Sequence, residues 1–233
     1  MTTSLDILSN GEISVEGRLV AASNATLFTT ITLGERSCNA IYKPFSGERP
    51  LWDFPDGTLG LRERAAYVLS ELGEFNLVPT TILRDGPFGR GAVQLWIDVD
   101  ESIDMALYYR QRNPSLRSAV LFDAVINNTD RKIGHLLPTK EGELFLCDHG
   151  VTFHEEFKLR TVLWQWAGEE LSSEEMARLQ ALHSMIFEST TELDELLSHQ
   201  EIEALNQRIQ DLLKEGRFPN PSEDWPAIPW PPF

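Results

Sequence analysis

A chain of 233 residues with 42% hydrophobic and 24% charged residues has an ordinary globular composition and suits one large domain or one domain in two lobes. Its formal net charge of −16 opposes binding to nucleic acid, which needs clustered Lys and Arg, and weakens docking on anionic lipid. Without a run of about 18 apolar residues or a secretory-type N-terminus, the expectation is a cytoplasmic monomer with no integral membrane association.

The first hundred residues are predicted to be rich in β-strand. Alternating residues predict strands over 12–20, 27–33, 38–43, 77–85 and 91–100. The first three form a meander, and the reversal "GPFGRG" joins the last two. Between these groups, a loop rich in Pro and Gly precedes a predicted helix over Leu61–Leu72 that packs on the sheet.

The second half is predicted to be mostly helical. Helical spacing appears over residues 102–109, 115–127, 159–166, 172–187 and 191–216. Two short strands, "HLLPT" and "LFLCD", interrupt these helices. The pattern predicts an α+β fold with a cleft between a β-rich first lobe and a helical second lobe.

The predicted domain division has three parts. Residues 1–97 form the first lobe, 98–218 form the helical lobe, and 219–233 form a proline-rich tail. Proline at this density favours extended geometry. The tail is interpreted either as a strap along the body or as a docking motif for a partner, and the strap is favoured because isolated exposed aromatic residues promote aggregation.

Candidate residues for phosphoryl transfer occur in both predicted lobes. This reaction needs a cation on the phosphates, carboxylates that hold Mg²⁺, and an aspartate that orients or deprotonates the acceptor hydroxyl. Lys43 ends the third strand and could supply the cation. Glu63 on the following helix could hold Lys43 through an ion pair, with Glu48 and Glu71 as alternatives.

Two aspartates in the second half complete this set. Asp130 follows an apolar helix in a polar loop, a setting suited to an acid or base. Asp148 ends a short strand just before a glycine and could face a metal ion. Near these aspartates in the sequence, His135 or Asn128 could supply a second ligand or a hydrogen bond. Each residue alone is usually an ordinary surface or capping group, so the hypothesis depends on their order along the chain.

Several motifs resemble a known superfamily. "AIYKP", "NNTDRKIGHLL" and "LFLCDHG" resemble the lysine strand, catalytic loop and metal-binding segment of the phosphatidylinositol 3-/4-kinase-like branch of the protein-kinase-like superfamily. "YKPFSGERPLWDFPDGTL", "VPTTILRDGPFGRGAVQLW" and "KLRTVLWQWAG" resemble a small actinobacterial family placed in that branch. The resemblance covers roughly residues 12 to 170, and the catalytic loop is also similar to that of HipA-type serine/threonine kinases.

The resemblance implies a role for each candidate residue. Lys43 would contact the α- and β-phosphates of ATP, Glu63 would position it, Asp130 would be the catalytic aspartate, and Asp148 would be the principal Mg²⁺ ligand. A turn containing Ser23, Asn24 and Thr26 would cover the phosphates. The segment "QLWID", from Gln94 through Leu95, Trp96 and Ile97 to Asp98, would be the hinge whose backbone meets adenine.

Two departures from the family pattern affect the predicted function. His135 stands where lipid kinases have Asn, so the second metal contact would tolerate Mn²⁺ better or be absent. Only about ten residues separate Asp148 from the predicted helix at 159–166, which is short for a segment that selects an acceptor, and only Lys158 and Arg160 are basic there.

These observations favour an ATP- and Mg²⁺- or Mn²⁺-dependent phosphotransferase whose acceptor is a protein or a small soluble molecule. The alternatives are a pseudokinase or nucleotide-binding regulatory scaffold, a phosphoinositide kinase, and an α+β protein with an unrelated task.

Overall fold

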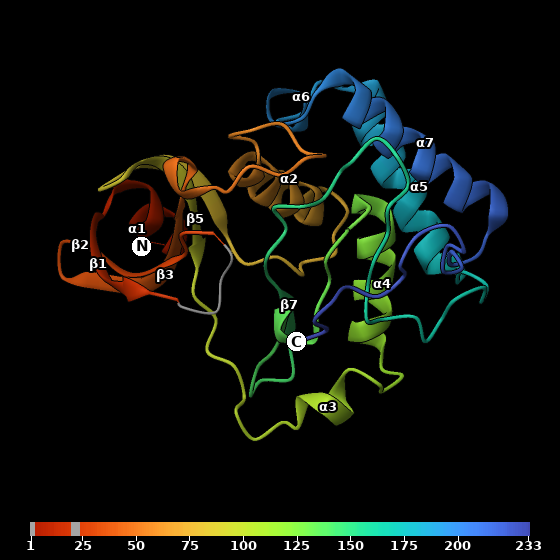
Figure 1. Ribbon diagram of the computed structural model, residues 1–233, viewed down its shortest axis with the longest axis horizontal. Coiled ribbons are helices and arrows are strands. Elements are labelled where there is room, and N and C mark those ends of the chain that lie inside the picture. The colour runs from red at the N-terminus through yellow and green to blue at the C-terminus, as the bar shows by residue number, and fades with distance from the viewer. Residues whose placement is uncertain (1–2, 20–23) are drawn as a thin grey trace.

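A five-stranded antiparallel sheet lies at one end of the molecule (Figure 1). The computed structural model describes residues 3–19 and 24–233. The strand order is β1-β2-β3-β5-β4. The strands are β1 (Glu12–Arg18), β2 (Leu27–Leu33), β3 (Arg36–Pro44), β4 (Thr81–Gly86) and β5 (Gly89–Leu95). The predicted meander and the predicted reversal between the last two strands are therefore confirmed.

A short helix that the sequence analysis did not predict packs against this sheet. Helix α1 (Ser4–Asn10) begins with a capping box, in which the Asp6 N–H donates to Thr3 Oγ1 at 3.2 Å and the Thr3 N–H donates to Asp6 Oδ2 at 2.8 Å. Its Ile7 and Leu8 are buried in a small core with sheet residues such as Tyr42. Seven residues with two buried positions are too few to show helical periodicity.

Helix α2 (Leu59–Leu72) connects the sheet with the helical part of the molecule. It follows a long loop that contains the short 3₁₀ helix η1 (Phe45–Gly47). Contacts with β4 and β5 confirm that α2 packs on the sheet. It also contacts α6 (Leu193–Leu196), and its Ala65, Ala66 and Leu69 belong to the larger core of the second half.

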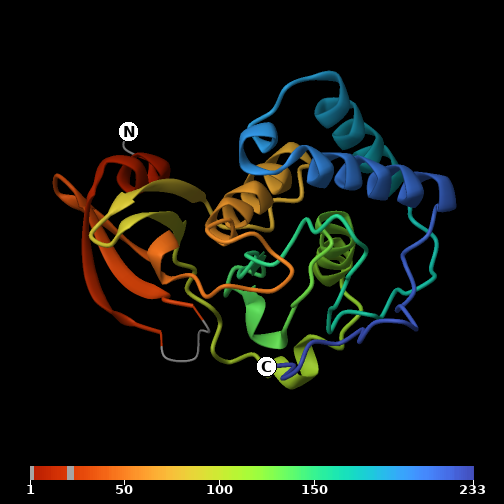
Figure 2. The same cartoon turned by 45° about the horizontal axis from the view of Figure 1, so that its top comes forward.

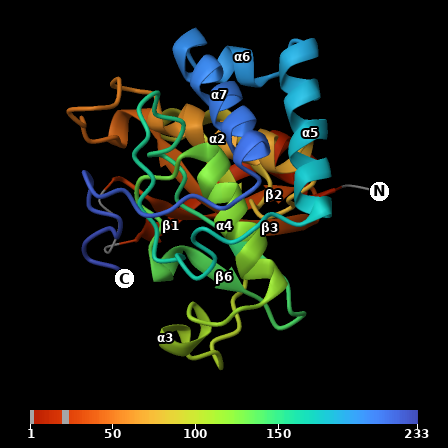
Figure 3. The ribbon, with the colours of Figure 1, turned by 90° about the vertical axis from the view of Figure 1, so that its right-hand side faces the viewer.

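The second half is mostly helical, as predicted. Its helices are α3 (Met105–Tyr108), α4 (Pro114–Ile126), α5 (Ser173–Glu188), α6 and α7 (His199–Glu215). The 3₁₀ helix η2 (Ile133–His135) precedes a hairpin of β6 (Leu136–Pro138) and β7 (Leu144–Leu146). Helix α4 lies in the centre, covered by α7 (Figures 2 and 3). All residues of its second half are buried. The architecture is thus α+β, with a sheet-rich part and a helical part.

The predicted helix over residues 159–166 is wrong. The segment is irregular and lies beside the loop after α4, where Arg160 N–H donates to Asn128 O at 2.9 Å and Val162 N–H donates to Arg131 O at 3.2 Å. Most of its apolar residues are buried. Their spacing along the chain happens to match that of a helix, which explains the wrong prediction. The backbone hydrogen bonds are instead made with another segment.

The proline-rich tail lies along the body of the protein. The Ala227 carbonyl accepts hydrogen bonds from the Thr161 N–H and the Trp164 indole N–H, both at 3.0 Å. The Pro232 carbonyl accepts from the Ile133 N–H at 2.8 Å. The C-terminus ends beside the β6–β7 hairpin (Figure 1). These contacts support the interpretation of the tail as a strap along the body of the protein.

The boundary between the two parts falls in the connector from β5 to α3. The division at residues 97 and 98 lies within it. Helix α2 precedes this division, but its core residues belong to the larger core of the second half, so the exact domain division stays a prediction. Across residues 3–19 and 24–233, no helix combines the length and apolar character needed to cross a bilayer.

Candidate active site

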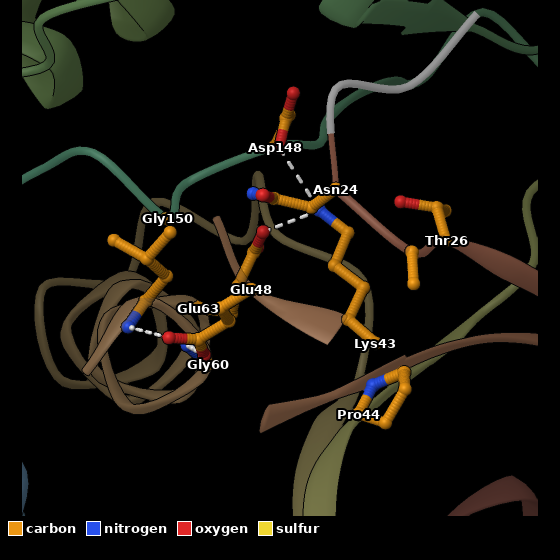
Figure 4. Close-up of a pocket in the computed structure, with 11 residues that line it drawn as sticks. Asn24, Thr26, Lys43, Pro44, Glu48, Gly60, Glu63, Asp148 and Gly150 are labelled. Carbon is orange, nitrogen blue, oxygen red and sulfur yellow. Dashed lines mark hydrogen bonds and ion pairs between the residues drawn. The ribbon is translucent and has the colours of Figure 1, made fainter. Parts of the chain in front are cut away.

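Lys43 lies between two acidic side chains that come from distant parts of the sequence. Its Nζ contacts Glu63 Oε1 from α2 and lies 3.0 Å from Asp148 Oδ1, just after β7 (Figure 4). Strand alternation turns Tyr42 into the small core and Lys43 to the opposite face. Burial acts to lower the pKa of Lys43, but the two carboxylates outweigh it and hold the pKa above its usual value. The lysine is therefore charged.

Glu63 links the lysine to the segment that carries Asp148. Its side chain is only 4% exposed, and its Oε2 accepts a hydrogen bond from the His149 backbone N–H at 3.0 Å. Of the two alternatives, Glu48 instead accepts from the N–H groups of Leu59 and Gly60 in the first turn of α2, at 3.2 and 2.8 Å. Glu71 is exposed near the other end of α2. The structure therefore selects Glu63 as the partner of the lysine.

Asp148 projects from a left-handed backbone position. Its φ is 60°, and its side chain is 52% exposed. The ammonium group of Lys43 holds the pKa of this carboxyl below its usual range, with a smaller contribution from His135. Asp148 is therefore an ionised oxygen donor that is open to a ligand.

His135 contacts Asp148 on the side away from the lysine. Its Nε2 lies 3.4 Å from Asp148 Oδ2, and its Nδ1 accepts a hydrogen bond from the Lys132 backbone N–H at 3.3 Å. Burial lowers the pKa of His135 to about 4, so the ring is neutral at pH 7. A neutral ring that accepts at Nδ1 carries its proton on Nε2, facing Asp148. In this tautomer the Nε2 atom, 3.4 Å from Asp148 Oδ2, has no lone pair for a metal ion.

Asp130 lies in a loop that is fixed by buried polar groups. Helix α4 ends at Ile126 and is capped by Asn127, which has a left-handed φ of 51°. Asn128 is fully buried, accepts a hydrogen bond from the Asp130 N–H at 2.9 Å and donates to Asp123 at 3.0 Å. This asparagine therefore positions the aspartate and is not available as a metal ligand.

The carboxyl of Asp130 has the electrostatics of a candidate base. Burial raises the pKa of Asp130, an effect that Lys132 opposes and Asp148 reinforces. Lys132 Nζ lies 3.1 Å from Asp130 Oδ2. Candidate catalytic bases commonly have a raised pKa of this kind.

Arg131 connects the segments that carry the two aspartates, a role that the sequence analysis missed. Its fully buried guanidinium donates to Asp123 on α4 at 2.9 Å and to the Cys147 carbonyl at 2.8 Å. It also lies 2.9 Å from the Nε2 atom of His149. The two residues that flank Asp148 are thus tied to the loop that carries Asp130. Asp123 in an apolar helix was the available signal, because a buried aspartate needs a partner.

A cleft that is open to solvent contains Lys43, Glu63 and Asp148, whereas Asp130 and His135 are not among the residues that line it. Its walls are formed by Asn24, Ala25, Thr26, Lys43, Pro44, Glu48, Leu59, Gly60, Glu63, Asp148 and Gly150 (Figure 4). Asn24 and Thr26, which were predicted to cover the phosphates, therefore lie in the same cleft as Lys43. Ser23, predicted with them, lies outside the described residues.

The predicted adenine hinge offers fewer free groups than expected. Gln94 is buried and donates from its side chain to Thr81 at 2.8 Å. The N–H groups of Leu95 and Trp96 already donate to Thr80 and Asn39, at 2.8 and 3.0 Å. Within the described part of the chain, the Ile97 N–H has no such partner. Of these backbone N–H groups, that of Ile97 is therefore the one left to donate to a ligand.

Two known proteins are similar to this chain along most of its length. No protein-family model matches. Among solved structures, the Helicobacter pylori proinflammatory kinase CtkA aligns over 90% of this chain and 94% of that chain, with a TM-score of 0.46 and 12% identity. A likeness of this size says nothing about activity. The Mycobacterium tuberculosis protein Rv2133c is 40% identical over 97% of this chain and 94% of its own. This protein therefore belongs to the same family as Rv2133c of Mycobacterium tuberculosis.

Proposed function

We propose that this protein is an ATP-dependent phosphotransferase whose nucleotide binds at Lys43. The observation that carries the proposal is the position of this ammonium group, in a cleft, between the carboxylates of Glu63 and Asp148. Phosphoryl transfer needs a cation on the phosphates and a carboxylate for the metal ion in such an arrangement. Lys43 would contact the α- and β-phosphates, and Glu63 would hold the lysine in place.

The side chains beside Lys43 fit a magnesium ion. Asp148 is an ionised, half-exposed oxygen donor, which suits an ion that prefers oxygen and keeps several water and phosphate ligands. The described residues contain no group of three or more His, Cys, Asp or Glu side chains arranged for a metal ion, so the protein would supply few ligands. A bound ion would neutralise charge on the phosphates. His135 would orient Asp148, and would join as a ligand, better to Mn²⁺, only after a change of tautomer.

Asp130 is proposed to accept the proton of the acceptor hydroxyl. The O–H bond breaks as the acceptor oxygen bonds to the γ-phosphorus, and the bond from that phosphorus to the ADP oxygen breaks. The proton moves to the carboxylate of Asp130, whose raised pKa favours this step. Lys132, 3.1 Å from Asp130, would orient the carboxylate.

The acceptor is proposed to be a protein side chain or a small soluble molecule. The net charge of −16 disfavours an anionic membrane surface. A phosphoinositide substrate, as the resemblance to phosphatidylinositol 3-/4-kinases would imply, is therefore the less favoured alternative.

Thermal unfolding with nucleotide and metal tests the donor site. ATP with Mg²⁺ or Mn²⁺ at one hundred times the dissociation constant should stabilise the protein by about 2.7 kcal/mol. Lys43→Met should abolish this shift, and Lys214→Met, at an exposed position on α7, should retain it. Absence of any shift in the wild-type protein would remove the proposal.

Transfer of label from γ-labelled ATP tests the reaction and the class of acceptor. Asp130→Asn should bind nucleotide normally but lose transfer to components of a cell lysate. Transfer only to phosphoinositide vesicles would reverse the ranking of acceptors.

A pseudokinase is the second candidate. It is favoured because the Nε2 atom of His135, which faces Asp148, carries a proton and so has no lone pair for a metal ion. It predicts equal background turnover by wild-type protein and Asp130→Asn.

A further inference from the structure

Arg160 lies beside the loop that carries Asp130. Its N–H donates to the Asn128 carbonyl at 2.9 Å, and its carbonyl accepts from the Arg131 N–H at 3.1 Å. These two bonds join Arg160 to residues on either side of Asp130. Because Asn128 and Arg131 are themselves buried and hydrogen-bonded, the backbone of Arg160 is held in a fixed position beside the candidate base.

The guanidinium group of Arg160 has no acidic partner. Within residues 3–19 and 24–233, no carboxylate lies within ion-pair distance of it, and its buried Nε has no hydrogen-bond partner. The group is nevertheless close enough to Asp130 to act on its pKa in the lowering direction. A buried guanidinium nitrogen without a hydrogen-bond partner, beside the candidate base, needs an explanation.

The neighbouring cations are already engaged. Lys132 pairs with Asp130, and Lys43 pairs with Glu63 and Asp148. The ammonium of Lys158, the other basic residue of this segment, is surrounded by two carboxylates, an imidazole and two indole rings. These groups belong to Asp53, Glu156, His154, Trp52 and Trp225. Of the cations on this segment and loop, Arg160 is therefore the one left to bind a ligand.

The location of Arg160 assigns it to the acceptor side of the reaction. Lys43 and Asp148 take the donor phosphates, and the acceptor hydroxyl must meet Asp130 from a different direction. A guanidinium group binds a carboxylate or phosphate through two parallel hydrogen bonds, which fixes orientation as well as position.

We propose that Arg160 determines acceptor specificity by binding a carboxylate or phosphate of a small soluble acceptor, so that a neighbouring hydroxyl of the same molecule reaches Asp130. This inference rests on the proposed phosphotransferase function and names the chemical class of its acceptor: a hydroxylated carboxylic acid or phosphate ester. Neutral polyols of the same size would lack the anchoring group.

Calorimetric titration of the protein loaded with Mg²⁺ and a nonhydrolysable ATP analogue tests the proposal. The analogue fills the γ-phosphate position, so an added anion cannot bind there. Glycerate and glycerol 3-phosphate should bind, and glycerol should bind much more weakly. Arg160→Ala should weaken both anions about tenfold or more, because a hydrogen bond to a charged group is lost.

Three controls separate this result from other causes. Arg160→Ala should bind the ATP analogue as the wild type does, which shows that the protein is folded and the donor site intact. Arg90→Ala, at an exposed arginine in the β4–β5 hairpin, should bind the anions normally. Vesicles of phosphatidylcholine and phosphatidylinositol should give no signal that depends on Arg160.

Each other outcome decides against the proposal. Equal anion binding by wild type and Arg160→Ala, or no anion binding beside normal binding of the analogue, overturns the role of Arg160 and leaves the proposed function standing. A response to the vesicles alone overturns the soluble acceptor. Failure of the ATP analogue to bind overturns both proposals.

Discussion

The left-handed backbone of Asp148 limits which side chains this position accepts. A φ of 60° is disfavoured for most residues, but short polar side chains such as Asp and Asn tolerate it. We expect Asp148→Ala to unfold at lower urea than Asp148→Asn, by about 1 kcal/mol in free energy of unfolding. Both variants remove the charge, so both should lose the metal-dependent shift with ATP. Equal stability of the two would show that the conformation imposes no strain.

The site residues that could be predicted are those whose chemistry is visible in the sequence. Lys43 at a strand end, Glu63 on the next helix and Asp148 before Gly150 were chosen in this way, and the structure brings these three together. Arg131 was missed because its role depends on contacts with Asp123 and the Cys147 carbonyl, which spacing alone does not reveal.

The predicted role of His135 illustrates a different limit. Its distance from Asp130 along the chain suggested a metal ligand, but its tautomer is set by a backbone N–H, from Lys132, that no sequence pattern specifies. Side-chain orientation and protonation depend on the folded surroundings of the ring, and these decide whether a histidine can ligate.

Among the elements, α2 is held by ion pairs on both sides of Glu63. Arg62, which is fully buried, pairs with Glu201 on α7, and Arg64 pairs with Glu192 at 2.7 Å. Arg62 also donates to the Thr152 carbonyl at 3.1 Å, four residues after Asp148. The helix that positions the lysine is therefore tied directly to the helical part of the molecule.

These two ion pairs differ in burial, which gives a matched prediction. Glu201→Gln should reduce the free energy of unfolding by up to about 3–5 kcal/mol, because it leaves the buried Arg62 without its counter-ion. Glu192→Gln removes a partner that is 42% exposed and should change stability by at most about 1 kcal/mol. Urea unfolding of the two variants measures the difference. Similar losses would mean that burial of Arg62 does not determine the strength of its pair.

The start of α5 should make stability depend on pH. Glu175 accepts hydrogen bonds from Arg117 at 2.8 Å and from the Ser172 N–H at 2.7 Å. Burial acts to raise the pKa of Glu175, but these bonds outweigh it and the pKa is lowered. The unfolded chain therefore takes up this proton first as pH falls. The stabilisation by this carboxylate is complete above pH about 4.5 and is lost as pH falls through the lower pKa of the folded state.

Glu175→Gln isolates this contribution. The variant should be less stable than the wild type near neutral pH, and the difference should shrink as the pH falls below about 4.5. Urea unfolding at several pH values measures it. A difference that stays constant with pH would assign the effect of the mutation to packing in place of charge.

The elements that could be predicted are those with long, regular patterns. The strands of the meander and helices α4 and α5 were placed within a few residues of their observed bounds. The single helical stretch predicted over 191–216 is divided in the structure into α6 and α7. The irregular segment at 159–166 was mistaken for a helix because its buried apolar residues happen to have helical spacing. Which partner takes the backbone hydrogen bonds of a segment is decided by the fold, and periodicity does not report it.

On the scale of the whole molecule, the cleft lies between two cores of unequal size. The small core joins α1 to the sheet, and the large core joins α2 to the helices of the second half. Lys43 comes from the first part, whereas Glu63 belongs to a helix that both parts share. Any change in the relation of the two parts would therefore alter the contact between the lysine and Asp148.

The geometry of the candidate site also depends on the C-terminal tail, because the tail contacts the segments beside Asp130. Its carbonyl groups accept the N–H groups of Thr161, which follows Arg160, and of Ile133, three residues after Asp130. A chain that ends at Phe218 should lose these two bonds and the bond from the Trp164 indole. At about 1 kcal/mol each, the loss is about 3 kcal/mol, before any loss of packing.

Urea unfolding of the truncated chain and of the Trp230→Ala variant distinguishes the two interpretations of the tail, as a strap or as a docking motif. Trp230 is 85% exposed, so its removal should change stability by no more than about 0.5 kcal/mol. Binding of ATP should be nearly unaffected by the truncation, because none of the residues that line the cleft lies in the tail. Phosphoryl transfer should fall, since the segment of Arg160 and the loop of Asp130 both lose contacts. If the truncated chain is as stable and active as the full one, the tail has no structural role, and its exposed aromatic residues are better explained as a surface for a partner.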